Sequence, residues 1–226
     1  MSQFVQNMFA SISKKYDLLN DILSLGIHKK WRRKSVQLAS PDNNSKVLDI
    51  ACGTGDFAFE FEPFTSNIIG IDFCEEMLEI ARQKANKRNS SVQFIQGDAL
   101  NLPFEDASFD IVSIGFGIRN VDDVNKSIAE MFRILKPQGK AIILEFGQPE
   151  NPFFRFIYNI YSKYFMPFIG KIIASSKEAY TYLPTTAGLF PCRNNFLDIA
   201  RKSANFKKMS YYSLTFGIAY IYILEK

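Results

Sequence analysis

The segment that most constrains the fold is 46–58, with the sequence KVLDIACGTGDFA. It begins with a short apolar run after a polar stretch, which is typical of a buried strand in a parallel sheet. Gly53 and Gly55 follow, and glycine lets the chain turn sharply and bring bare backbone against a ligand. We expect Asp56 to open the next helix, where the positive end of the helix dipole favours a carboxylate. The segment therefore predicts a strand, a glycine loop and a helix at a ligand site.

The glycine loop is compatible with two cofactors. Residues 53–58 also satisfy the G-x-G-x-x-G/A pattern of a dinucleotide site. Asp49, at the end of the strand, favours S-adenosylmethionine instead. Its carboxylate can meet the ammonium group of that molecule, directly or through water, whereas it would repel a pyrophosphate.

Acidic residues end three successive strand-like runs. Asp72 follows the apolar run 68–71 at roughly the separation of about 20 residues at which an acidic side chain takes ribose hydroxyls. Asp98 closes the next run and precedes Ala99. A ligand that carries ribose, adenine and an ammonium group uses all three carboxylates, counting Asp49. The alternative, a solvated aspartate at a strand end, explains one such residue more readily than three.

Apolar runs and helical periods alternate along the chain. We expect helices near 3–38 and at 55–62, 74–88, 122–135 and 194–203, and strands at 46–51, 67–72, 92–97, 109–114, 140–146, 208–215 and 218–224. This alternation predicts an α/β fold with a doubly wound, mostly parallel sheet, whose ligand lies beyond the carboxyl ends of the strands. Only Phe216 and Gly217 separate the last two runs, which indicates an antiparallel pair at one edge.

Length and composition indicate a single domain. The chain has 226 residues, 47% of them hydrophobic, and no Pro/Gly/Ser-rich linker divides it. We expect an N-terminal helical cap at 1–40, a cofactor-binding core at 41–149, an aromatic insertion or lid at 150–182, and a C-terminal helix and strand pair at 183–226. The N-terminus lacks the pattern of a secretory signal, and the three cysteines show no C-x-x-C spacing. We therefore expect free thiols, no metal centre and a cytoplasmic location.

Three segments resemble signatures of a known family, the ubiquinone/menaquinone biosynthesis C-methyltransferases. The first is YDLLND at 16–21, the second GFGIRNVDD at 115–123, and the third RILKPQGKAIILEF at 133–146. Further residues match the first signature at set distances: Ser24, His28 and Trp31. The resemblance covers nearly the whole chain, although Gln138 stands where the family usually has glycine.

The resemblance implies a Rossmann-like, class I S-adenosylmethionine domain with seven strands. It implies cofactor contacts at Thr54, Asp72, Asp98 and Ala99, and a prenylated hydroquinone such as demethylmenaquinol as the substrate. Methylation of another lipophilic phenol or small metabolite remains open. From other classes, an NAD-dependent oxidoreductase and a non-catalytic S-adenosylmethionine-binding module also remain open. Neither tail length nor the choice between naphthoquinol and benzoquinol follows from the residues.

The chemistry needs a group that holds negative charge. S-adenosylmethionine carries an activated methyl group, so the protein has mainly to align an electron-rich carbon with it. A hydroquinone provides that carbon when its hydroxyl ionises, whereas a quinone does not. Arg119 follows the strand 109–114, and its permanent charge can stabilise a phenolate without acting as a base. We assign Asn120 to orienting a water or the second ring oxygen.

Three residues of the N-terminal segment are further candidates. His28 is the only histidine, and an unperturbed pKa near 6.5 suits proton transfer. A lone histidine on an amphipathic segment is more often structural, so both roles stay open for His28. We expect Tyr16 and Asp17 to close the substrate pocket.

Aromatic and basic segments bear on partners. Residues 151–176 contain eight aromatic and three basic residues and no acidic one. That composition fits a pocket for a prenyl tail or an in-plane contact with anionic lipid, and lid packing is the alternative. Basic residues also cluster at 29–34, but a net charge of +4 is small for a nucleic-acid binder. We therefore expect no nucleic-acid partner, a transient contact at the inner face of the membrane, and leave self-association open.

Overall fold

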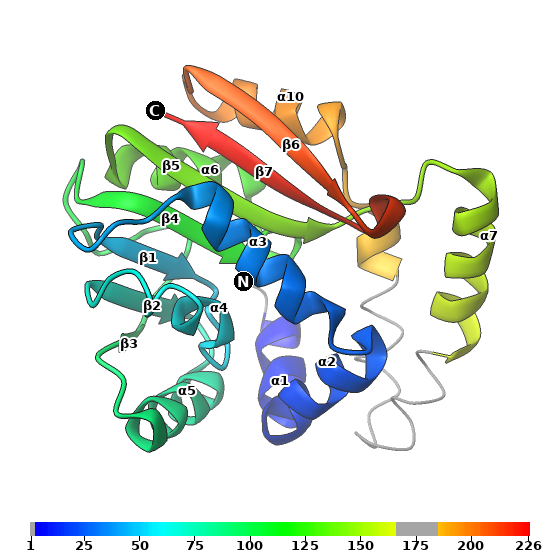
Figure 1. Cartoon of the computed structure of the whole chain (residues 1–226), viewed down its shortest axis with the longest axis horizontal. Helices are drawn as coiled ribbons and strands as arrows, with labels where there is room; N and C mark the ends of the chain where they lie inside the picture. Colours follow the sequence, from blue (N-terminus) through cyan, green and yellow to red (C-terminus); the bar gives the residue numbers. More distant parts are fainter. Residues whose placement is uncertain (1–2, 166–184) are drawn as a thin grey trace.

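The computed structural model describes residues 3–165 and 185–226. Its centre is a sheet of seven strands: β1 (Val47–Ile50), β2 (Ile68–Asp72), β3 (Gln93–Gln96), β4 (Phe109–Gly115), β5 (Leu135–Phe146), β6 (Lys208–Leu214) and β7 (Ala219–Glu225). The order across the sheet is β3-β2-β1-β4-β5-β7-β6 (Figure 1). Neighbours from β3 to β5 pair in parallel, while β7 pairs antiparallel with both β5 and β6. The predicted doubly wound sheet and its antiparallel edge pair are confirmed.

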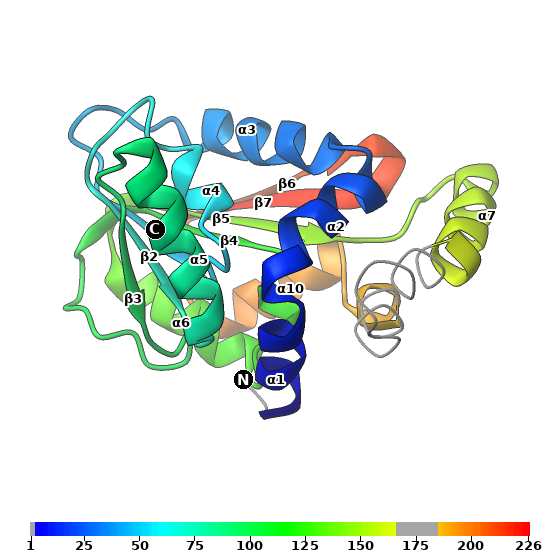
Figure 2. The same ribbon diagram turned by 90° about the horizontal axis from the view of Figure 1, so that it is seen from below.

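Helices cover both faces of this sheet. The elements are α3 (Ile27–Ala39), α4 (Asp56–Phe59), α5 (Glu75–Arg88), α6 (Val124–Ile134) and α10 (Asn194–Ser203). Buried side chains of α3, α4 and α5 share one apolar cluster with the sheet, and those of α6 and α10 share another. In Figure 2, α3 lies on one side of the sheet, and α6 and α10 lie on the other.

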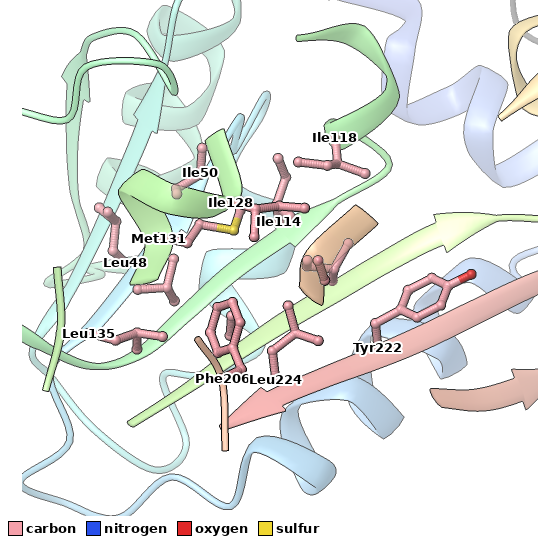
Figure 3. Packing of buried hydrophobic residues seen from close by; sticks show 14 of the residues in the cluster. Leu48, Ile50, Ile114, Ile118, Ile128, Met131, Leu135, Phe206, Tyr222 and Leu224 are labelled. Atoms are coloured by element: carbon pink, nitrogen blue, oxygen red, sulfur yellow. The ribbon is translucent and has the colours of Figure 1, made fainter. Parts of the chain in front are cut away.

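Strand β1 contributes to both clusters because successive side chains of a strand point to opposite faces. Leu48 and Ile50 pack toward α6, against residues such as Ile128 and Met131 (Figure 3). Val47 belongs to the cluster under α3. All four residues of β1 are buried. The strand therefore holds the loop that follows it in a fixed position.

The N-terminal segment is helical, as predicted, but not continuous. Helix α1 (Gln3–Ile12), the short helix η1 (Ser13–Lys15) and helix α2 (Tyr16–Ser24) precede α3. Leu25 and Gly26, both in the left-handed region with φ of 50° and 72°, separate α2 from α3. Four apolar residues of this cap form a small cluster of their own: Val5, Met8, Ile12 and Leu19.

Two sequence-based element assignments need correction. The helix expected at 55–62 is only α4, Asp56–Phe59. Beyond it the amides of Glu60 and Phe61 bond carbonyls three residues back, and the position before Pro63 disfavours helix. The strand expected at 140–146 begins earlier, at Leu135, directly after α6, and its pairing with β4 is irregular there.

Helix α7 (Pro152–Ile160) begins the expected aromatic insertion. The Asn151 side chain caps it by accepting from the amide of Phe153. None of its residues is buried, and in Figure 1 it stands apart from the sheet. A π-helical turn, η3 (Tyr161–Phe165), continues it. The remainder of the predicted insertion, residues 166–182, lies outside the described residues.

Candidate active site

Two hollows lie at the carboxyl ends of the central strands, where the doubly wound fold predicts the ligand. The larger is a cavity of about 580 Å³, and the smaller has about 20 Å³. Ala51, directly after β1, lines both hollows. The cap helices, the glycine loop and α7 surround the larger one, whereas the ends of β2 and β3 border the smaller one.

The two glycines of the loop serve different purposes. Gly53 has a φ of 54°, lines the larger cavity, and a Cβ added there would meet nothing within 4 Å. Gly55 has a φ of 85°, but a Cβ at this position would lie 2.6 Å from the ring of Phe94. Gly53 therefore leaves open space for a ligand, whereas Gly55 allows the loop to pack closely against the sheet.

The carboxylate of Asp72 holds the glycine loop by a hydrogen bond. Its Oδ2 accepts from the amide of Gly53 at 2.8 Å, and its Oδ1 accepts from the amide of Cys74 at 2.8 Å. Burial raises the pKa of this carboxyl, and the two amide donors oppose that shift. Asp72, Asp98 and Ala99 all line the smaller hollow. The structure thus brings together three of the residues expected at a nucleoside.

Asp49 lies beneath the loop and is fully buried. Ser113 donates to its Oδ1 at 2.7 Å, while its Oδ2 has no hydrogen-bond partner among the described residues. Burial raises the pKa of Asp49 to about 7, although the Ser113 hydroxyl opposes the shift. Asp49 is not one of the residues that line either hollow. A buried carboxylate oxygen without a donor fits a water or an ammonium group as its partner.

The N-terminal cap is tied directly to the glycine loop. The Thr54 hydroxyl donates to Oδ1 of Asp17 at 2.6 Å, and Nζ of Lys84 donates to Oδ2 at 2.9 Å. Lys84 also pairs with Asp56 at the start of α4. Tyr16, Asp17 and Thr54 all line the larger cavity. Asp17 therefore closes the cavity wall by binding the loop.

Arg119 lines the larger cavity and is paired with a residue that the sequence interpretation missed. Its Nη1 donates to Oε1 of Glu145 at 2.6 Å and to the carbonyl of Phe116 at 2.7 Å. The side chains of Arg119 and Glu145 are only 2% and 0% exposed. The sequence interpretation considered the charge of Arg119 alone and did not include this carboxylate partner. A charged residue within the apolar run AIILEF was the available signal.

The structure places Asn120 outside the lining of both hollows, so it is not in position to orient a water or a ring oxygen there. It is buried, and its Nδ2 donates to the carbonyl of Phe116 at 3.4 Å. Arg119 lines the larger cavity, but Asn120 lines neither hollow. Both side chains donate to the carbonyl of Phe116, but only that of Arg119 belongs to a residue that lines the cavity.

His28 lines the cavity as a neutral residue. Its Nδ1 lies 2.5 Å from the hydroxyl of Ser24, and its Nε2 lies 3.5 Å from Asp21. Burial, together with the nearby charge of Arg32, lowers the pKa of His28 to about 4. The expectation of an unperturbed pKa near 6.5 is therefore wrong. The pKa is lowered mainly because the imidazole is buried, and this burial depends on the packing of α2 against α3.

Aromatic side chains form much of the cavity wall, and the sequence interpretation missed several of them. The rings of Phe116 and Phe146 lie 4.4 Å apart, with Trp31 about 6.2 Å from Phe116. The indole of Trp31 donates to Thr215 at 3.0 Å. Cys52 also lines the cavity, but burial raises the pKa of its thiol, which makes it a poor nucleophile.

Helix α7 closes the cavity on the far side. The lining residues of α7 and of the first position of η3 follow a helical period: Phe154, Ile157, Tyr158 and Tyr161. The ring of Phe154 stacks on Phe216 with 4.1 Å between centroids, and the Tyr161 hydroxyl donates to the carbonyl of Leu23. Within the described residues, no helix is long and apolar enough to cross a membrane.

Solved structures of other proteins share the fold of this chain. A solved Thermotoga maritima structure described as an S-adenosylmethionine-dependent methyltransferase, possibly acting on histamine, superposes with a TM-score of 0.67. It is 22% identical, and the match covers 97% of this chain and 99% of that one. A putative methyltransferase from Methanococcus maripaludis gives a TM-score of 0.64 at 21% identity, over 95% and 91% of the two chains. At this identity the likeness establishes the fold alone.

Sequence relatives are closer. "Ubiquinone/menaquinone biosynthesis C-methyltransferase" of Bdellovibrio bacteriovorus is 46% identical, over 97% of this chain and 94% of that protein. "Demethylmenaquinone methyltransferase" of Deinococcus radiodurans is 42% identical over 99% and 93%, and that of Thermus thermophilus is 40% identical over 97% and 100%. The model of the ubiE/COQ5 methyltransferase family matches residues 1–226. The chain therefore belongs to the ubiE/COQ5 methyltransferase family and is an S-adenosylmethionine-dependent methyltransferase.

Proposed function

We propose that the chain methylates a ring carbon of a prenylated hydroquinone, of which demethylmenaquinol is the best-supported example. The observation that carries the proposal is the form of the larger cavity. Its lining combines polar side chains, such as Tyr16, His28 and Arg119, with many aromatic and aliphatic ones. A prenylated hydroquinone likewise combines an oxygen-bearing ring with an apolar tail. The names of the sequence relatives support this substrate class.

The residues present fit S-adenosylmethionine. We assign Gly53, Gly55 and Thr54 to the loop that holds it, with Asp49 below the loop serving its ammonium group. Asp72, Asp98 and Ala99 would serve its ribose and adenine. The open space beside Gly53 and the unpartnered oxygen of Asp49 support this assignment. When bound, the cofactor supplies a methyl group activated by a cationic sulfur.

The chain's own residues have to hold a reduced ring in place and dispose of a proton. Ionisation of a ring hydroxyl pushes electron density to the adjacent carbon, so the oxygen needs a partner for its negative charge. Arg119 is the proposed partner, because it is permanently protonated and lines the cavity. Aromatic side chains such as Phe116 and Phe146 line the same cavity, and apolar surroundings strengthen such an interaction.

The other residues proposed to contact the ring do not carry a permanent charge that could hold the phenolate. With a pKa of about 4, His28 is neutral at pH 7 and can accept a hydrogen bond, but it is a weak base. We therefore propose that it orients the ring hydroxyl. Tyr16 and Asp17 are proposed to complete the pocket. Asn120 keeps only an indirect part, through the backbone of Phe116.

We also propose that α7 gives the protein a transient, peripheral contact with the membrane that holds its substrate. The outer face of α7 is apolar and exposed; its residues include Phe153 at 66% and Phe156 at 64%. A helix that is apolar on both faces needs a second apolar surface. In sedimentation with anionic vesicles, Phe153→Ser/Phe156→Ser should bind less than wild type, and the exposed Phe64→Ser should bind equally. Equal binding by all three proteins would exclude α7 from the contact.

The test of the function is chemical. Cells that lack the protein should accumulate the demethylated quinone, and expression of this chain should restore the methylated one, as measured by mass spectrometry. A thermal-shift comparison separates the other classes, because a ligand that binds only the folded state stabilises it by RT ln(1 + [L]/Kd). We expect stabilisation by S-adenosylmethionine and none by NAD. Stabilisation by NAD alone, with no change in quinones, would replace the proposal with an oxidoreductase.

A further inference from the structure

The buried pair of Arg119 and Glu145 differs from the other ion pairs of the described residues. Their side chains are 2% and 0% exposed, whereas the pair of Arg133 and Glu130 on α6 is 30% and 17% exposed. Taking two charges out of water costs more than their attraction returns unless further hydrogen bonds satisfy them. A pair buried this deeply at the wall of the cavity therefore points to a function beyond stability.

Glu145 is fixed by the sheet and by three donors. It lies on β5, between β4 and β7, where it pairs in register with Tyr220. Its Oε1 accepts from Nη1 of Arg119 at 2.6 Å and from the amide of Phe146 at 2.8 Å, and its Oε2 accepts from the amide of Arg119 at 3.4 Å. The carboxylate thus holds both the side chain and the backbone of Arg119.

Arg119 is held at one corner of its guanidinium. Its hydrogen bonds to Glu145 and to the carbonyl of Phe116 both leave from Nη1. Its Nε is buried and has no hydrogen-bond partner among the described residues. A buried donor without an acceptor is costly, and native proteins rarely tolerate one outside a functional site. Because Nε is itself buried, a ligand oxygen would meet another part of the guanidinium of Arg119, which lines the cavity.

We propose that Glu145 is a positioning residue of the methyl transfer, which holds Arg119 by Nη1 and by its backbone amide and so keeps the guanidinium at the cavity wall, beside an oxygen of the hydroquinone. Glu145 does not line the cavity, so it acts only through Arg119. It also balances the charge of Arg119, which lowers the cost of burying the guanidinium. This inference rests on the proposed function, because the oxygen belongs to the proposed substrate.

A double-mutant cycle tests the inference, with Glu145→Gln, Arg119→Gln and the double variant. The assay uses the full chain, S-adenosylmethionine and a short-chain demethylmenaquinol kept reduced. Glu145→Gln alone should lower kcat about 30-fold, the scale for a displaced catalytic group, with the KM for S-adenosylmethionine within about twofold. In the Arg119→Gln background, the same change should lower kcat less than about threefold, because the residue that it positions is gone.

The matched control is Glu130→Gln, which removes the carboxylate of the other arginine–glutamate pair and should leave kcat unchanged. NMR of the arginine Nε–H groups gives a readout besides activity: the Arg119 signal should be sharp in wild type and broadened by exchange in Glu145→Gln. Should Glu145→Gln fail to fold, Glu145→Asp serves in the same cycle and should show the same non-additivity.

Three outcomes are distinguishable. Failure of wild type to methylate any reduced prenylated hydroquinone would reject the proposed function itself. With an active wild type, equal fold-losses from Glu145→Gln in both backgrounds would reject the positioning role, as would a wild-type kcat in the folded variant. Non-additive losses together with a broadened Arg119 signal would support it.

Discussion

The two ends of the site are built in different ways. At the proposed cofactor end, the loop after β1 and the carboxylate at the end of β2 lie within 20 residues of each other, and the backbone amide of Gly53 makes the contact with Asp72. At the substrate end, side chains from the cap, β5 and α7 meet around Arg119. The comparison teaches that local backbone geometry determines the arrangement of the proposed cofactor end, whereas packing between distant segments determines that of the proposed substrate end. Substitutions at the two ends should therefore affect different measured quantities.

The largest expected effect lies at the substrate end. Arg119→Gln should lower kcat by about 100-fold or more, the scale for removing a preorganised charge-stabilising donor, while the Kd for S-adenosylmethionine changes less than about twofold. Lysine at this position should restore activity only in part, because a point charge does not reproduce the planar guanidinium. Steady-state kinetics and calorimetry measure the two quantities. An equal loss of cofactor affinity would break the distinction between the ends.

A substitution at the proposed cofactor end should instead weaken cofactor binding. Asp72→Ala should weaken S-adenosylmethionine binding by roughly 1.5 to 3 kcal/mol, because a charge-assisted acceptor is lost and the amide of Gly53 loses its partner. Isothermal titration calorimetry measures the change. Asp110→Ala is the matched control, since Asp110 accepts from the amide of Lys46 away from both hollows. Unchanged affinity in a folded Asp72→Ala variant would remove Asp72 from the site.

His28, at the proposed substrate end, should make the free energy of unfolding depend on pH. Its folded pKa of about 4 lies below the unfolded value near 6.5, so the folded state binds fewer protons between these values. The stability that neutral His28 contributes is complete above pH 6.5 and is lost as pH falls. Between pH 7.5 and pH 5 the free energy of unfolding should fall by about 2 kcal/mol more in wild type than in His28→Gln.

Urea denaturation of both proteins at each pH measures this difference. The raised pKa of Asp49 acts in the opposite sense, because the folded state then binds more protons, but it is common to both proteins and cancels. Parallel pH dependences would mean that His28 is not buried as neutral imidazole. The cavity wall formed by α2 and α3 would then be more open than described.

The smallest expected effect is a control remote from both ends. Gln138 has a φ of 69° and is exposed, in the left-handed region that favours glycine. Gln138→Gly should raise the free energy of unfolding by about 0.5 kcal/mol, because relief of strain outweighs the added freedom of the unfolded chain. Thermal unfolding measures it, with no change in kcat. A clear loss of stability would show that Gln138 is unstrained.

The sequence predicted that the glycine loop and the strand-end aspartates lie close together, because the signals for this arrangement are local. Glycines after an apolar strand, and aspartates at successive strand ends, occupy one edge of a parallel sheet wherever the strands alternate with helices. The predicted order of strands and helices followed from the same periods. Even there, the helix after Gly55 was overestimated, because turns that bury Phe61 replace it.

The substrate end was predicted only in part because its properties arise from contacts between distant segments. The pairing of Arg119 with Glu145 joins residues 26 positions apart, one in the segment after β4 and the other on the adjacent strand β5. The lowered pKa of His28 depends on burial that no local pattern reveals. The tie between Asp17 and Thr54 likewise spans 37 positions. A glutamate inside an apolar strand is the one signal that was present and overlooked.

The most direct test of the central claim is the redox dependence of methyl transfer. Purified protein is mixed with S-adenosylmethionine labelled in its methyl group and a short-chain demethylmenaquinone, with and without a reductant, and the products are analysed by mass spectrometry. We predict labelled, ring-methylated product only under reducing conditions, because only the hydroquinone offers the ionisable oxygen that we propose Arg119 to hold. Equal methylation of the oxidised quinone without any reductant would contradict the account.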